Sequence, residues 1–284
     1  MKPLLSAPEL LTLLQGQQTN VVIIDARAGA ADIRQQYEAQ HVHGALFVSL
    51  EDELAHKSEN AANGGRHPLP SVERFAELLG RRLGITPETY VVVYDDKNGA
   101  NAASRFWWML RAVGHEKVQV LDGGLQAAIA SGVPVDSEPV AVKAQSKYNA
   151  QSWTLQTRTM DEVADVAVSK QHIVVDVRDR ERYLGNQEPI DLIAGHIPGA
   201  INIPFAGNLD ERGFFRSPEE LRTKYSEAFA EVPLANVTVH CGSGVTACHT
   251  LLALAHAGME IPALYVGSWS EWSRNPREIA TGEK

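Results

Sequence analysis

The chain has 284 residues, a length that favours two domains of ordinary size. Its 26 Lys and Arg stand against 35 Asp and Glu, with no basic block, so neither nucleic acid nor an anionic membrane is expected as a partner. The two cysteines cannot build a disulfide framework, and we expect a reducing compartment, the cytoplasm. Pro3, Pro8 and Glu9 interrupt the N-terminus and no long apolar run follows, so neither a signal peptide nor a membrane span is predicted.

A helix followed by a buried strand is predicted at residues 6–24, and the same order recurs at residues 159–175. The first helix opens with a capping box, in which Glu9 follows Ser6 by three residues. The later segments match as well: Asp25-Ala26-Arg27 with Asp176-Val177-Arg178, His41-Val42-His43-Gly44-Ala45 with His196-Ile197-Pro198-Gly199-Ala200, and the strand at 90–94 with that at 236–240. Because matches in the same order are hard to obtain by chance, they indicate a tandem duplication.

The alternation of strands and helices in each copy predicts an α/β fold, with two tandem domains that each contain a mainly parallel sheet covered by helices on both faces. We place the domains at residues 1–140 and 158–284, joined by a linker at 141–157 where the apolar periodicity disappears. A cleft between such domains is the expected ligand site. Asp25 and Asp176 occur in both copies, so we predict that they hold the fold by pairing with nearby arginines.

The strand at 236–240 ends in Cys241, and Gly242 and Gly244 follow before the next helical pattern. This loop is too short for its amides to find partners in a ladder or a helix, and the glycines permit dihedrals that turn those N–H groups inward. Inward amides and the positive end of the helix favour a thiolate, which makes Cys241 the candidate nucleophile. Copy one carries Asp95 at this place, so we expect a single reaction centre.

These residues resemble the tandem-domain rhodanese family, the thiosulfate and 3-mercaptopyruvate sulfurtransferases. The resemblance covers nearly the whole chain, through Arg105-Phe106-Trp107-Trp108-Met109, Asp176-Val177-Arg178, His196-Ile197-Pro198-Gly199-Ala200, Cys241-Gly242-Ser243-Gly244-Val245-Thr246-Ala247 and Gly267-Ser268-Trp269-Ser270-Glu271-Trp272. It implies two rhodanese-like domains, of which the second is catalytic. Gly242 and Ser243 are typical of the 3-mercaptopyruvate branch, because thiosulfate-preferring members more often place Arg-Lys there.

The resemblance implies a transferase that works by ping-pong sulfur transfer. The Cys241 thiolate attacks the sulfane sulfur of a small anionic donor and becomes a persulfide. It then passes the sulfur to cyanide or to a thiol, such as thioredoxin or a low-molecular-weight thiol. With 3-mercaptopyruvate as the donor, the released product is pyruvate. We expect no cofactor and no metal, since Cys241, Cys248 and their neighbouring histidines form no tetrahedral set.

The resemblance also implies the donor-binding residues. Arg182 matches one of the family's two arginines, and the cysteine loop supplies Gly242, Ser243, Gly244, Val245 and Thr246. Ile190 stands where the second arginine is usual, and residues 183–187 look more like the thiosulfate branch. We give the cysteine loop more weight than the arginine region, because the loop touches the reacting sulfur. We therefore favour 3-mercaptopyruvate as the donor, with thiosulfate as the alternative.

A proton relay proposed for 3-mercaptopyruvate sulfurtransferases is implied too. Ser243 and His67 match its serine and histidine, and Glu51 stands at the position of its acid. A histidine can protonate the leaving enolate of pyruvate near neutral pH, which gives the relay a chemical purpose. Trp269 and Trp272 are predicted to serve packing.

Two other functions compete with sulfur transfer. Dual-specificity phosphatases share this fold class, but in them an arginine follows the nucleophilic cysteine after five intervening residues, and here that place holds Ala247. Phosphate-ester hydrolysis would therefore lack its transition-state partner. A non-catalytic binding or sulfur-carrier module would form a persulfide without turnover, and the intact cysteine loop favours an enzyme instead.

Overall fold

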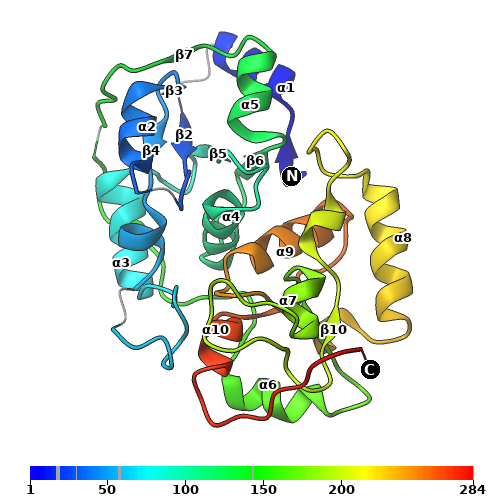
Figure 1. Cartoon of the computed structure of the whole chain (residues 1–284). Coiled ribbons are helices and arrows are strands. Elements are labelled where there is room, and N and C mark those ends of the chain that lie inside the picture. Colours follow the sequence, from blue (N-terminus) through cyan, green and yellow to red (C-terminus); the bar gives the residue numbers. More distant parts are fainter. Residues whose placement is uncertain (17–19, 30, 57–58, 143, 284) are drawn as a thin grey trace. The chain divides into compact units, whose positions relative to one another are not determined.

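The structure, a computed structural model, describes residues 1–16, 20–29, 31–56, 59–142 and 144–283. The chain forms two compact units, whose elements are labelled in Figure 1. Unit 1 consists of Met1–Ala55, Pro70–Thr154 and Glu211–Phe215, and unit 2 of His56–Leu69, Leu155–Asp210 and Arg216–Lys284. Two short segments thus belong to the unit built mainly by the other half of the chain. The sequence-based domain bounds, 1–140 and 158–284, stay predictions.

Unit 1 is built on a parallel sheet with the strand order β1-β6-β5-β2-β4. The strands are β1 (Leu4–Leu5), β2 (Val21–Asp25), β4 (Leu46–Phe47), β5 (Tyr90–Tyr94) and β6 (Val118–Leu121), beside the antiparallel pair β3 (His41–Val42) and β7 (Val135–Asp136). The helices are α1 (Ala7–Gln15), α2 (Ile33–Ala39), α3 (Val72–Glu77), α4 (Ala102–Ala112) and α5 (Gly124–Ala130), with the π-helical turns η1 (Leu50–Leu54) and η2 (Leu78–Arg82).

Unit 2 repeats this plan with the strand order β8-β12-β11-β9-β10, again parallel. The strands are β8 (Thr157–Arg158), β9 (Ile173–Asp176), β10 (Ile201–Asn202), β11 (Val237–His240) and β12 (Ala263–Tyr265). The helices are α6 (Met160–Ala167), α7 (Arg180–Leu184), α8 (Pro218–Phe229), α9 (Thr246–His256) and α10 (Ser268–Trp272), with the 3-10 turns η3 (Phe205–Asn208) and η4 (Leu234–Asn236).

The two sheets correspond strand for strand. β1, β6, β5, β2 and β4 occupy the places that β8, β12, β11, β9 and β10 occupy in unit 2. The middle strands β5 and β11 run directly into Asp95 and Cys241. The predicted α/β fold with two mainly parallel sheets is confirmed, and Cys241 lies at the carboxyl end of a parallel strand, where such sheets bind ligands.

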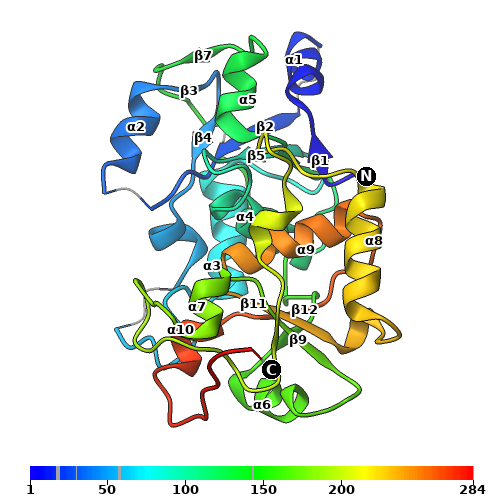
Figure 2. The same cartoon turned by 45° about the vertical axis from the view of Figure 1, so that its right-hand side comes forward.

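Helices cover both faces of each sheet because the strands are buried on both sides. In β5, Val92 and Tyr94 belong to the core cluster that contains Leu10 of α1 and Leu125 of α5, whereas their neighbour Val93, also buried, points to the opposite face. In unit 2, α6 and α10 pack together on one face, and Figure 2 shows α9 on the other side of β9, β11 and β12.

The repeated Asp-x-Arg segments form buried ion pairs at corresponding places. Arg27 Nε donates to Asp25 in unit 1, and Arg178 Nε donates to Asp176 in unit 2, each at 3.0 Å. Burial is the largest influence on the pKa of Asp176 and raises it, but the charges of Arg178 and His240 and the hydrogen bonds from Arg178 together outweigh it, so the pKa lies below its usual value. The prediction that Asp25 and Asp176 pair with nearby arginines is confirmed.

Candidate active site

The loop between β11 and α9 holds the predicted nucleophile. Cys241 is 1% exposed, and the Gly244 N–H donates to its Sγ at 3.1 Å. Gly244 has φ +75°, and a Cβ there would lie 2.5 Å from the Val266 carbonyl oxygen, so this position requires glycine. Val245 precedes the helix and Thr246 is its first residue. The predicted order of strand, loop and helix is confirmed.

Gly242, unlike Gly244, is not among the glycines with a positive φ. Its missing side chain instead leaves room for charged groups. A Cβ at Gly242 would lie 3.2 Å from Arg66 Nη2, 3.4 Å from Asp191 Oδ2 and 3.5 Å from Arg182 Nη2. The cysteine loop is therefore bordered by two guanidinium groups and a carboxylate.

The corresponding loop of unit 1 holds an anion, the carboxylate of Asp95. Its oxygens accept backbone N–H groups from Lys97 at 2.9 Å, Gly99 at 2.8 Å, Asn101 at 3.0 Å and Ala103 at 3.3 Å. Burial nevertheless raises the pKa of Asp95 to about 6. A loop at this place in the fold can thus direct several amides at one anionic group, as the sequence predicted for the thiolate of Cys241.

Helix α10 fixes the backbone of the cysteine loop. The Cys241 N–H donates to Ser268 Oγ at 3.2 Å, and the N–H groups of Trp269 and Ser270 donate to the carbonyls of Cys241 and Gly242 at 3.0 and 2.8 Å. The sequence interpretation assigned the tryptophans here to packing, which their burial bears out, but it missed this positioning of the nucleophile. In the sequence, the Gly267–Trp272 motif was the signal from which this role of α10 could have been inferred.

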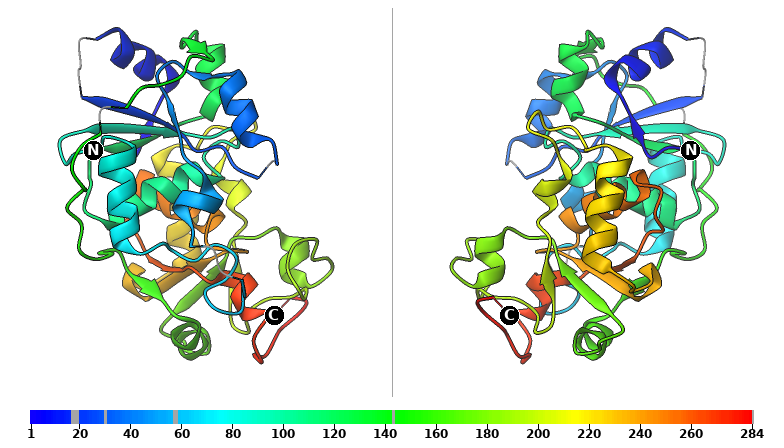
Figure 3. Two further views of the ribbon diagram at one scale, coloured as in Figure 1. Left: turned by 90° about the vertical axis from the view of Figure 1, so that its left-hand side faces the viewer. Right: turned by 90° about the vertical axis from the view of Figure 1, so that its right-hand side faces the viewer.

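The segment before Leu69 brings His67 to the loop. The Gly64 N–H donates to Glu271 Oε1 at 2.8 Å and the Arg66 N–H donates to Ser270 Oγ at 3.0 Å, so this segment is attached to α10. Figure 3 shows the two side by side, with α10 in red. His67 Nδ1 lies 2.8 Å from Ser243 Oγ. The structure therefore brings together the predicted serine and histidine of the relay.

Arg182, on α7, is held by two carboxylates. Its Nε donates to Glu188 Oε1 at 3.0 Å, and its Nη2 donates to Asp191 Oδ2 at 3.1 Å. Asp191 also accepts from Arg66 Nε at 3.0 Å and from Arg274 Nη1 at 3.3 Å. Burial raises the pKa of Glu188, but the bonds and charge of Arg182 and the backbone N–H groups of Asp191 and Ile190 together outweigh it and hold the pKa below its usual value. Arg66 and Asp191 were not identified from the sequence.

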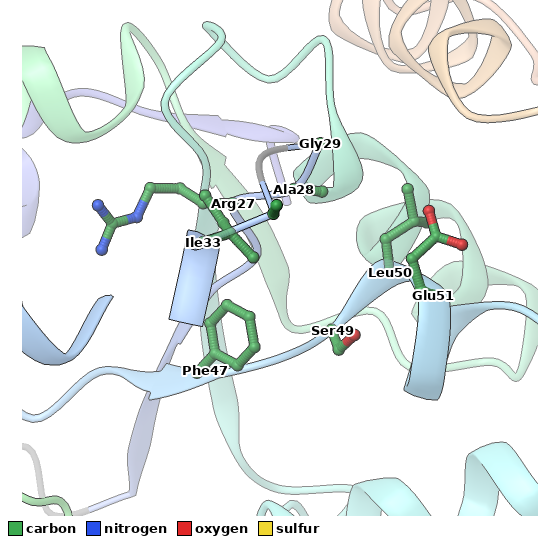
Figure 4. Close-up of a pocket in the computed structure, with 9 residues that line it drawn as sticks. Arg27, Ala28, Gly29, Ile33, Phe47, Ser49, Leu50 and Glu51 are labelled. Atoms are coloured by element: carbon green, nitrogen blue, oxygen red, sulfur yellow. The ribbon is translucent and has the colours of Figure 1, made fainter. Parts of the chain in front are cut away.

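Glu51 belongs to unit 1, where it is exposed at the start of η1 and lines a pocket with Arg27, Phe47 and Leu50. In Figure 4 its carboxylate and the Arg27 guanidinium point away from each other. A role for Glu51 in the relay stays a prediction.

No cluster of His, Cys, Asp or Glu suited to a metal ion occurs among the residues that the structure describes. Within the same residues, every helix is too short or too polar to cross a membrane.

Comparisons with known proteins agree with this fold. A family model described as a rhodanese-like domain matches residues 6–131 and again residues 159–275. A probable 3-mercaptopyruvate sulfurtransferase from Pseudomonas aeruginosa is 36% identical, over 99% of this chain and 98% of its own. A thiosulfate sulfurtransferase from Gallus gallus is 38% identical, over 85% of this chain and 81% of its own.

Among solved structures, the 3-mercaptopyruvate sulfurtransferase from Leishmania major matches with a TM-score of 0.82 and 31% identity, over 96% of this chain and 74% of that one. These relatives are named as sulfurtransferases, as the motifs led us to expect. The chain belongs to the rhodanese-like family and carries the domain twice.

Proposed function

We propose that this protein transfers a sulfane sulfur from 3-mercaptopyruvate to a thiol or to cyanide through a persulfide on Cys241. The observation that carries the proposal is the cysteine loop itself. It holds a cysteine at the end of the middle strand, an amide on its sulfur and the Ser243–His67 pair beside it.

In the first half-reaction the Cys241 thiolate attacks the donor sulfur. An S–S bond forms, the C–S bond of the donor breaks, and its electron pair leaves with the carbon as the enolate of pyruvate. The enolate takes a proton and pyruvate departs. The persulfide is again an anion at the loop, so an inward amide such as the Gly244 N–H stabilises the enzyme before and after this step.

In the second half-reaction an acceptor thiolate or cyanide attacks the outer sulfur of the persulfide. The S–S bond to Cys241 breaks, and the cysteine leaves as a thiolate, ready for the next donor. We propose a thiol such as thioredoxin or a low-molecular-weight thiol as the acceptor in the cytoplasm. Cys241 and Cys248 are not joined in a disulfide, which suits such a reducing compartment.

His67 and Ser243 favour 3-mercaptopyruvate over thiosulfate as the donor. An enolate needs a proton, which a histidine can deliver through a serine hydroxyl at 2.8 Å. Sulfite, the leaving group of thiosulfate, departs as a stable anion and needs no such relay. Thiosulfate remains the second candidate because Arg66 and Arg182 together add positive charge for a dianion beside Gly242.

The test compares kcat/KM for both donors, with cyanide as the acceptor, in the wild type, Cys241→Ser and Cys248→Ala. We expect the wild type to prefer 3-mercaptopyruvate and Cys241→Ser to lose both activities. Cys248→Ala, in α9, should still gain one sulfur atom in a mass spectrum after donor treatment. Activity in Cys241→Ser would refute the reaction centre, and a wild-type preference for thiosulfate would refute the choice of donor.

A further inference from the structure

The sequence leaves the donor site short of one cation, because Ile190 stands where the second arginine of the family is usual. In the structure the Ile190 side chain is uncharged and 54% exposed. A second guanidinium nevertheless lies at the cysteine loop. It comes from Arg66, far earlier in the chain and directly before His67.

Arg66 and Arg182 border the same residue of the cysteine loop. Their Nη2 atoms lie 3.2 and 3.5 Å from the position of a Cβ on Gly242, next to Cys241. Two guanidinium groups that close together repel each other unless a carboxylate lies between them or an anion binds both. Here Asp191 fills the first role.

Asp191 holds both arginines from one side. Its side chain is fully buried, and it accepts from Arg66 Nε and from Arg182 Nη2. Because Asp191 binds Arg66 through Nε, the Nη2 of Arg66 is directed at the loop instead. The Arg66 side chain is 30% exposed, so a small molecule can reach it.

The charges of this cluster do not balance. The connected ion pairs among the described residues join four arginines to three carboxylates: Arg66, Arg178, Arg182 and Arg274 to Asp176, Glu188 and Asp191. One positive charge is left over in a partly buried site, where its interaction with a small anion is screened less than in water. The cluster therefore suits a singly charged carboxylate.

We propose that Arg66 supplies the second guanidinium for the carboxylate of the donor, in partnership with Arg182, and so replaces the arginine that is missing at Ile190. The proposal rests on the proposed function, because it names how the same site binds its donor. Asp191 acts as a positioning residue that aims both guanidinium groups at Gly242. A carboxylate bound there lies at Gly242, the residue that follows Cys241 in the loop.

The test uses Arg66→Gln, Arg66→Lys and Arg274→Gln. Arg274 is a matched control, because it also donates to Asp191 but is not among the atoms nearest to Gly242. Loss of a charged hydrogen bond predicts that Arg66→Gln raises KM for 3-mercaptopyruvate by roughly tenfold or more, with kcat nearly unchanged. Arg66→Lys should recover part of the loss. Arg274→Gln removes the same charge from the cluster but no group at Gly242, so it should raise KM clearly less than Arg66→Gln does. Equal KM values in Arg66→Gln and Arg274→Gln, or a fall in kcat alone, would overturn the proposal.

A second measurement separates this proposal from the choice of donor. In Cys241→Ser, which cannot turn over, calorimetry gives the Kd of pyruvate with and without Arg66→Gln. We expect the additional substitution to weaken pyruvate binding by roughly tenfold or more, whichever sulfur donor the wild type prefers. An unchanged Kd, or no pyruvate binding to Cys241→Ser itself, would contradict a role of Arg66 in carboxylate binding.

Discussion

Replacement of Asp95 by asparagine tests the anion-holding loop of unit 1. Burial raises the pKa of Asp95 from 3.8 to about 6, which corresponds to about 3 kcal/mol. Because the folded pKa lies above the unfolded one, the folded protein takes up the proton first as the pH falls. The favourable contribution of the protonated group is fully present below about pH 4 and is lost as the pH rises through about 6. The asparagine amide of the variant does not titrate in this range.

The assay is urea unfolding of the wild type and Asp95→Asn between about pH 3 and pH 7.5, followed by a probe in unit 1. We expect the free energy of unfolding of the wild type, relative to that of Asp95→Asn, to fall by about 3 kcal/mol over this range. Subtracting the free energy of unfolding of Asp95→Asn from that of the wild type at each pH cancels the contribution of the other carboxylates. Parallel stability curves, or an NMR titration that gives Asp95 a pKa near 4, would refute the reasoning.

Two further predictions concern the cysteine loop. Gly244→Ala places a Cβ at φ +75° and 2.5 Å from a carbonyl oxygen, so the loop must move, and we expect kcat/KM to fall by about tenfold or more and thermal stability to drop. A variant with normal persulfide formation would show that the loop geometry is not needed. His67→Gln should lower kcat for 3-mercaptopyruvate far more than for thiosulfate, and equal losses with both donors in steady-state assays would argue against its role as proton donor.

Most of the fold could be predicted because its signals are local. The capping box of Ser6 and Glu9 forms as expected, and the buried strand that follows is β2. The internal repeat in the sequence also showed that Asp95 and Cys241 occupy corresponding positions at the ends of the middle strands, which no single helix or strand could show. Such features can be predicted from the hydrophobic periodicity of the sequence and from the order of its motifs along the chain.

The partners of the cysteine loop could not be predicted in the same way. Arg66 and Asp191 are 125 residues apart, and Arg66 and Ser270 are 204 apart, so no spacing in the sequence connects them. Gly242 shows the same limit. A glycine beside a cysteine indicates backbone freedom, but here it provides space for side chains that only the folded chain brings near.

The segment His56–Leu69 explains why a copy without a nucleophile still matters for the reaction. Its sequence belongs to the first repeat, but in the fold it is part of unit 2, attached to α10 through Gly64 and Arg66. It supplies His67, which lies at Ser243, and Arg66, which lies at Gly242. The second repeat alone contains the cysteine, its loop and Arg182, but neither the proposed proton donor His67 nor the proposed second guanidinium of Arg66. In the proposed reaction the second repeat therefore supplies the sulfur nucleophile, and the first repeat supplies a histidine and an arginine that support it.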